Sequence, residues 1–180
     1  MAFGLRFKIA LLYILVSLRH GTSGIDRPLL YSVYGNDIQV RLRRIYDHPQ
    51  RDTPDGSLTV ALYGRTPAYV QCRFVEGGKR LACEIILGLY PPKQGRAAPV
   101  LSAAMAEKLQ QAGYRRDDSG RRVFTYEITP DSGAWGGASV VILDPLIGVF
   151  GARALSRIEI TAPLAPERDE AAIQRQMRGM

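Results

Sequence analysis

Apolar and polar residues alternate most clearly in the middle of the chain, on either side of two glycines. Residues 69–75 and 80–87 are runs of β-favouring side chains, and Gly77-Gly78 lies between them. Two consecutive glycines suit the positive φ angles of a type I′ turn, so the pattern predicts an antiparallel hairpin. Folding the chain about these glycines sets Cys72 opposite Cys83. The apolar residues of both runs then share one face, and a register shifted by one residue would scatter them.

The polar face of this hairpin carries Gln71 opposite Glu84. Side chains of this kind usually form a hydrogen-bonding ladder on the surface of a sheet. The alternative is that they belong to a surface that binds a partner, and Tyr69, Gln71 and Glu84 are our candidate residues for it. Trp135, in a predicted glycine-containing loop over residues 130–137, is a fourth candidate; it either fills a gap in the core or anchors a partner.

Cys72 and Cys83 are the only cysteines of the chain. Directly opposed residues of an antiparallel pair have Cα atoms about 4.5–5.5 Å apart, which allows a disulfide. Counted outward from a two-residue turn, this pair is a hydrogen-bonded one. We expect a disulfide between them if the chain is exported, and two reduced cysteines in an apolar face if it is cytoplasmic.

Four further segments complete the predicted sheet. Residues 38–43, 58–62 and 155–161 alternate with the period of a strand, and residues 122–128 form another β-favouring run. With the hairpin, they predict a single α+β domain over residues 25–164. Its antiparallel sheet has about five or six strands, and two main helices pack on one face.

The first of these helices begins at the N-cap Ser102 and ends at Gly113 in the left-handed C′ position. Its apolar stripe consists of Met105, Leu109 and Ala112. The second spans residues 138–151, which are almost wholly apolar. Asp144-Pro145 either kinks this helix or begins a shorter helix there.

The first 24 residues have the pattern of a secretory signal. Arg6 and Lys8 precede an apolar run over residues 9–18, and a stretch of small and polar residues follows. The run is too short to span a membrane, which takes about 20 apolar residues. Segment 1–24 therefore predicts a periplasmic or secreted protein; a buried N-terminal helix in a cytoplasmic protein is the alternative. Residues 165–180 are expected to form a polar helix or a disordered tail.

Composition narrows the class of protein more than the kind of partner. The 180 residues are 46% hydrophobic and 23% charged, which excludes a disordered chain and a multi-span membrane protein. Three of the basic residues behind the net charge of +7 lie in the signal-like segment. The others are mixed with acidic residues along the chain, and this diffuse charge argues against nucleic-acid binding.

The sequence has no pattern of a catalytic or metal site. Outside the signal-like segment His48 is the only histidine, so neither cysteine has an evident base. The aspartates near His48 do not have the spacing of a calcium-binding loop. Asp117, Asp118 and Glu127 keep an enzyme as a third hypothesis, but we expect no catalysis, no metal and no cofactor.

The order of elements over about residues 69–160 resembles the small α+β domain of type III secretion chaperones and their relatives, the TY-Chap group. The shared features are short pieces of sequence, namely Tyr69-Val70-Gln71-Cys72, Ala82-Cys83-Glu84, Gly113-Tyr114 and Val149-Phe150-Gly151. The resemblance implies a non-enzymatic domain that pairs with itself and holds a partner peptide along its sheet or helix surface. The signal-like segment and Pro145 depart from that pattern.

We therefore expect a non-catalytic, chaperone-like module that binds a protein or peptide, with a homodimer as a further expectation. The partner would dock on an open sheet edge, where backbone donors and acceptors are free, or near Trp135. The alternative from another class is an exported domain, stapled by the Cys72–Cys83 disulfide, that binds a small or anionic ligand.

Overall fold

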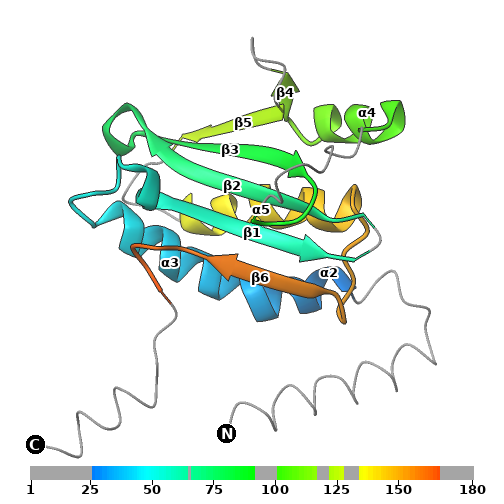
Figure 1. Ribbon diagram of the computed structural model, residues 1–180, viewed down its shortest axis with the longest axis horizontal. Helices are drawn as coiled ribbons and strands as arrows, with labels where there is room; N and C mark the ends of the chain where they lie inside the picture. Colours follow the sequence, from blue (N-terminus) through cyan, green and yellow to red (C-terminus); the bar gives the residue numbers. More distant parts are fainter. Residues whose placement is uncertain (1–25, 65, 92–100, 117–121, 128–133, 167–180) are drawn as a thin grey trace, which may run out of the picture.

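The computed structural model describes residues 26–64, 66–91, 101–116, 122–127 and 134–166 of the chain (Figure 1). They form a six-stranded antiparallel sheet in the order β4-β5-β3-β2-β1-β6 with helices packed against it, which confirms the predicted α+β class. The strands are β1 (Ser57–Tyr63), β2 (Ala68–Val75), β3 (Arg80–Leu87), β4 (Arg115–Arg116), β5 (Arg122–Glu127) and β6 (Arg157–Thr161). The helices are α2 (Asp26–Leu30), the π-helical turn η1 (Tyr31–Gly35), α3 (Asn36–Tyr46), α4 (Ala103–Gln111) and α5 (Ala134–Gly148).

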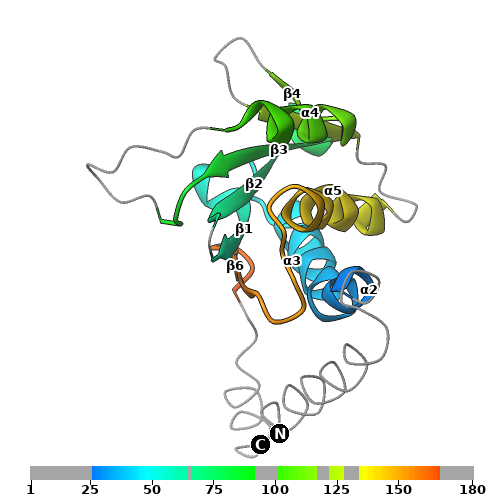
Figure 2. The same ribbon diagram turned by 90° about the vertical axis from the view of Figure 1, so that its right-hand side faces the viewer.

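One face of the sheet makes the core. Figure 2 shows α3 and α5 side by side against that face, with α4 near the β4 end of the sheet. The strands contribute alternate, fully or nearly fully buried residues: Leu58, Val60 and Leu62 of β1, Val70, Cys72 and Phe74 of β2, and Leu81, Cys83 and Ile85 of β3. They pack with buried side chains of α3 and α5 in one hydrophobic cluster. None of the described helices covers the opposite face.

The segment over residues 38–43 is helical, so its prediction as a strand is wrong. α2, η1 and α3 follow one another without a break and form one helical segment over residues 26–46. Ile38 and Leu42 are buried and lie four residues apart, on one face of the helix. Val40, which the strand prediction placed on the buried face with them, is 43% exposed.

The β2–β3 hairpin has the predicted register, with Cys72 paired with Cys83. Both residues of Gly77-Gly78 have positive φ, as the turn prediction requires, at 67° and 89°. Glu76 also has a positive φ, 54°, and the ladder stops one residue earlier on each side. The loop therefore comprises residues 76–79 rather than the two glycines alone.

The longer loop changes the kind of pair that the cysteines form. Gly88 N donates to Pro67 O over 2.8 Å, which marks a hydrogen-bonded pair of the hairpin. Because the two kinds of pair alternate along an antiparallel ladder, Cys72 and Cys83 form a non-hydrogen-bonded pair. Their Cα atoms are 4.0 Å apart, which fits the closer spacing of that kind. The predicted disulfide is present, and the expectation of a hydrogen-bonded pair is wrong.

α4 begins and ends where the sequence predicts. The Ser102 side chain accepts a hydrogen bond from Met105 N over 3.3 Å, and Gly113 follows the helix with a φ of 93°. Leu109 is buried and Met105 is half-buried, as the apolar stripe predicts. Ala112 is exposed, contrary to prediction, because it is the C-cap residue at which the chain leaves the helix.

α5 is one continuous helix with Pro145 inside it, so the break considered at Asp144-Pro145 is absent. It ends at Gly148, three residues before the predicted end. It begins at Ala134, earlier than predicted, so the part of the predicted loop after residue 133 is helical. Trp135 therefore lies on a helix and not on a loop.

The signal-like segment 1–24, Asp117 and Asp118 lie outside the described residues, as does most of the expected tail. The first tail residue, Ala165, is instead fully buried in the core. The Arg41 guanidinium, itself buried, donates to the Ala165 carbonyl over 3.5 Å. The folded domain therefore includes the start of the segment that the sequence assigns to a tail.

Candidate functional site

The side of the sheet opposite the helices is the main candidate surface. We call it the open face and define it by Thr59 and Ala61 of β1, Tyr69, Gln71 and Arg73 of β2, and Ala82, Glu84 and Ile86 of β3. Thr59, Ala61 and Tyr69 are buried, Arg73 is exposed, and the other four are half-buried. Three of the four predicted partner-binding residues, Tyr69, Gln71 and Glu84, lie together on it. Gln71 is the direct cross-strand neighbour of Glu84, as predicted.

Two further tyrosines form an aromatic corner of the open face with Tyr69. The ring centroids of Tyr69 and Tyr90 are 5.2 Å apart, and the Tyr63 hydroxyl donates to the Tyr90 carbonyl over 2.7 Å. The Arg157 guanidinium of β6 lies 4.8 Å from the centroid of the Tyr63 ring, a cation–π contact. The aromatic corner thus joins three strands and the segment after β3 in one surface.

Burial raises the pKa of both Tyr63 and Tyr69, and the nearby carboxylates of Glu159 and Glu84 respectively raise it further. Both phenols therefore keep their protons at neutral pH and remain hydrogen-bond donors. Sequence reasoning missed Tyr63 and Tyr90. In the alternating pattern of β1, Tyr63 occupies the next position on the face opposite the core, and this could have indicated its place on the open face. Tyr90 follows β3 in a segment without any periodic pattern.

Trp135 lies on the other side of the sheet. Its ring makes edge-on contacts with Tyr46 and Phe74, with centroids 5.4 and 6.3 Å apart. Phe74 is a core side chain of β2, so these contacts agree with the hypothesis that Trp135 fills a gap in the core. The structure does not bring Trp135 together with Tyr69, Gln71 and Glu84.

The sheet ends in two different edge strands. β4 has only two residues, Arg115 and Arg116, both exposed, and such a short charged edge is a poor template for pairing. β6 has five residues. Its Arg157 and Glu159 side chains are 75% and 48% exposed, while Ile158 is buried in the core.

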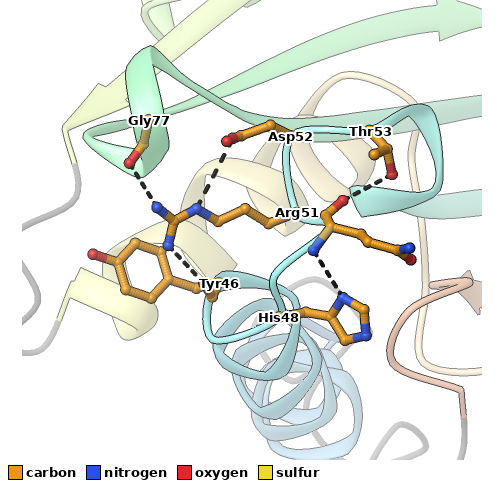
Figure 3. Close-up of polar contacts among 7 residues, drawn as sticks. Tyr46, His48, Arg51, Asp52, Thr53 and Gly77 are labelled. Atoms are coloured by element: carbon orange, nitrogen blue, oxygen red, sulfur yellow. Dashed lines mark hydrogen bonds and ion pairs between the residues drawn. The ribbon is translucent and has the colours of Figure 1, made fainter.

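The loop after α3, in which His48 and its neighbouring aspartates lie, is a structural junction (Figure 3). Arg51 Nη1 donates to Tyr46 O over 2.9 Å, and Arg51 Nη2 donates to Gly77 O over 3.0 Å. Arg51 thereby ties the end of α3 to the tip of the β2–β3 hairpin. His48 Nδ1 accepts a hydrogen bond from Gln50 N over 3.1 Å, which gives this histidine a local role in the turn.

A second candidate is a cleft of 260 Å³ between α2, α4 and α5. Arg27 and Lys108 bring positive charge to its wall, and Asp144 lies between the helices. Asp144 forms an ion pair with Arg27, and its other oxygen accepts a hydrogen bond from the Tyr31 hydroxyl. This carboxylate, which the sequence suggested only as part of a kink or of the start of a shorter helix, therefore links the N-terminal helical segment to α5.

Burial raises the pKa of Tyr114, whose hydroxyl donates to the Val141 carbonyl over 2.9 Å. An unfolded tyrosine ionises at a pH of about 10, whereas the buried one stays neutral, so this contribution to stability is complete below pH 10 and declines as the pH rises above it. We expect the free energy of unfolding to fall by about 1.4 kcal/mol per pH unit from this tyrosine. Urea unfolding at pH 9 and pH 11 tests this.

The Tyr114→Phe variant is the matched comparison, because it keeps the ring and removes the ionising group. We expect it to lose less stability between pH 9 and pH 11 than the wild type does. Equal losses in the two proteins would contradict the assignment to Tyr114.

Within the described ranges, no three side chains of His, Cys, Asp or Glu come together in the way that a metal ion requires. Both cysteines are joined in the Cys72–Cys83 disulfide. No helix in the same ranges has the length and apolar character needed to cross a membrane.

We compared the chain with protein-family models, with curated proteins and with solved structures, and none of them matches it. The features of the molecule that bear on its function are therefore the open face, the β6 edge and the cleft.

Proposed function

We propose that this chain is a non-catalytic module that binds a protein or peptide on the open face. The observation that carries the proposal is the grouping of Tyr69, Gln71 and Glu84 beside the aromatic corner, on a sheet face that no described helix covers. Tyrosine side chains supply apolar area and a hydroxyl together, a combination that is common in protein interfaces. Tyr63 and Tyr90 are the half-buried rings that offer this area, whereas Tyr69 is 6% exposed and supports them from below.

The likeness in element order to the secretion chaperones supports the same function, because in that group the sheet or helix surface holds a partner peptide. A disulfide is typical of proteins outside the reducing cytoplasm. The Cys72–Cys83 bond and the signal-like segment 1–24 therefore favour a periplasmic or secreted site of action.

Site-specific photo-crosslinking tests the proposal. A photoreactive phenylalanine analogue is placed at Gln71, on the open face, and a control is placed at Val140, which is 42% exposed on α5 on the helical side. We expect one discrete protein adduct from Gln71, formed in cells that express the chain, and none from Val140. Adducts of equal yield from both positions, or none from Gln71, would overturn the proposal.

A second step separates a specific partner from an adventitious one. The purified adduct partner is titrated against the wild type and against Arg73→Glu, which reverses an exposed charge on the open face. We expect the variant to bind at least about tenfold more weakly, since a charge reversal in an interface costs on the order of 1.4 kcal/mol or more. Unchanged binding would place the contact elsewhere.

The cleft of Arg27 and Lys108 favours the second candidate function, an exported domain that binds a small anionic ligand. The two cations outnumber the one carboxylate on its wall, so an anion is the charge it would accept. Native mass spectrometry of the purified chain distinguishes the two functions. A retained small anion that Lys108→Glu abolishes would support the cleft, and its absence together with a Gln71 adduct would support the open face.

A further inference from the structure

We infer that β6 is a self-pairing edge, and that two copies of the chain join antiparallel through it, with Ile158 on the two-fold axis. The joined molecule has one continuous sheet of two domains, with both open faces on the same side. This inference goes beyond the proposed partner site, because it concerns the edge of the sheet and not the open face.

Alternate peptide groups of β6 bond to β1, and those between them are free to pair with another strand. The hydrogen bond from Gly88 N to Pro67 O fixes which pairs of the hairpin are hydrogen-bonded. The alternation of pairs, carried across β2 and β1 in the observed register, makes Arg157 and Glu159 the β6 residues that bond to β1. The N–H and C=O groups of Ile158 and Ile160 therefore point away from the sheet, toward a strand that could be added.

The side chains of β6 favour one register between two copies. A two-fold pairing that uses those free groups can be centred on Ile158, Glu159 or Ile160. Centring on Glu159 sets this carboxylate against its own copy, and centring on Ile160 sets Arg157 against Pro163. Only the centre at Ile158 places Arg157 of each copy opposite Glu159 of the other.

That register places unlike charges directly opposite each other across the two strands, while the like charges of the two copies are only diagonal neighbours. Within one copy, Arg157 and Glu159 already form an ion pair at 3.5 Å. The second copy adds two cross-strand pairs of opposite sign, which stabilise antiparallel strands. Leu155, in the turn just before β6, is 64% exposed and lies beyond the end of the new ladder.

The alternative occupant of this edge is an extended peptide from another protein. Such a peptide would use the same free backbone groups of β6. Its side chains, however, would have no reason to carry charges opposite to those of Arg157 and Glu159. Arg157 and Glu159 are complemented by a strand that carries the same two charges but runs antiparallel. The β6 strand of a second copy is such a strand.

Charge reversal tests the inference by sedimentation equilibrium of the purified full-length chain. One strand edge buries less than a standard interface, so we expect a dimer with a dissociation constant in the micromolar range, on the order of 10–100 μM. Arg157→Glu and Glu159→Arg should each weaken the dimer about tenfold or more, since each sets like charges opposite in both symmetric pairs. The double variant R157E/E159R should restore the wild-type constant to within about threefold.

Two controls separate pairing from folding. Arg73→Glu changes the net charge as Arg157→Glu does, but on β2, so it should leave the dimer unchanged. At concentrations where every protein is monomeric, each variant should unfold near the wild-type thermal midpoint, because the side chains of Arg157 and Glu159 are well exposed. Arg157→Glu also loses the exposed cation–π contact with Tyr63, which is worth about 0.5–1 kcal/mol. A chain that stays monomeric at millimolar concentration, or a double variant as weak as the single ones, would overturn the inference.

Cysteine pairing checks the register itself. Arg157→Cys and Glu159→Cys proteins are mixed and oxidised, and we expect the mixed disulfide dimer to form several-fold faster than either protein links to itself. Self-linking of either protein at the same rate as mixed linking would contradict the centre at Ile158. A dimer without photo-crosslinked adducts at Gln71 would support this inference and overturn the proposed function. Adducts at Gln71 without a dimer would do the reverse.

Discussion

The Gly56→Ala variant is expected to lose about 3 kcal/mol of folding free energy, at the upper end of what overpacking costs. A Cβ built on Gly56 would lie 1.9 Å from the carbonyl oxygen of Arg51 and 2.5 Å from its carbonyl carbon. Both are backbone atoms, so no change of side-chain rotamer relieves the contact. The Arg51 backbone N–H donates to the His48 carbonyl over 3.1 Å, and its guanidinium donates to the carbonyls of Tyr46 and Gly77. These bonds oppose a shift of the loop away from the added Cβ.

Urea unfolding of the purified variant measures this loss. Gly64→Ala is the matched control, because its added Cβ meets no atom within 4 Å. We expect the control to unfold near the wild-type midpoint, and a Gly56→Ala protein that also does so would show that the loop relaxes freely.

Loss of the Cys72–Cys83 disulfide is expected to cost about 3 kcal/mol, since the bond closes a loop across 11 residues and restricts the unfolded chain. Both cysteines are buried in the core, so replacement by alanine keeps the site apolar. Replacement by serine would cost more, because each buried hydroxyl then needs a hydrogen-bond partner. The C72A/C83A and C72S/C83S variants should therefore fall in that order of stability.

The measurement is urea unfolding with and without dithiothreitol. The wild type should lose stability on reduction, whereas C72A/C83A should be indifferent to the reductant. Equal stability of the oxidised and reduced wild type would mean that the bond does not restrict the unfolded state.

The hairpin was predictable because two independent signals agree. Gly77-Gly78 requires a turn, and the apolar residues on both sides fix one register, so Cys72 and Cys83 had to be opposed. The exact length of the loop was not predictable. It depends on the positive φ of Glu76, and glutamate rarely adopts a positive φ, so nothing in the sequence indicated it.

The N-terminal helical segment was mistaken for a strand because six residues are too few to separate the two periods. Ile38, Val40 and Leu42 alternate, yet Ile38, Leu42 and Ile45 also fit a helix face, and the helix is correct. The longer window from Leu30 onward would have favoured the helix. The start of α5 was missed for another reason, since its glycines have low helix propensity and tertiary packing overrides that preference.

The candidate site was predictable in part. Gln71 and Glu84 follow from the hairpin register, because cross-strand neighbours share a face. The aromatic corner did not follow, since Tyr63 and Tyr90 meet Tyr69 only through contacts between segments that no periodic pattern connects. The link that Asp144 makes between helices was not predictable for the same reason, because its partners Arg27 and Tyr31 are far from it in the sequence.

The strand order has a consequence for the chain while it is being made. β1 is among the first segments to leave the ribosome, yet its outer neighbour β6 is the last strand to do so. Until β6 arrives, β1 exposes an apolar, hydrogen-bonding edge through the synthesis of β2, β3, α4, β5 and α5. A nascent chain of this kind needs either rapid completion or a holding factor, and arrest of translation just before Arg157 should leave it prone to aggregation.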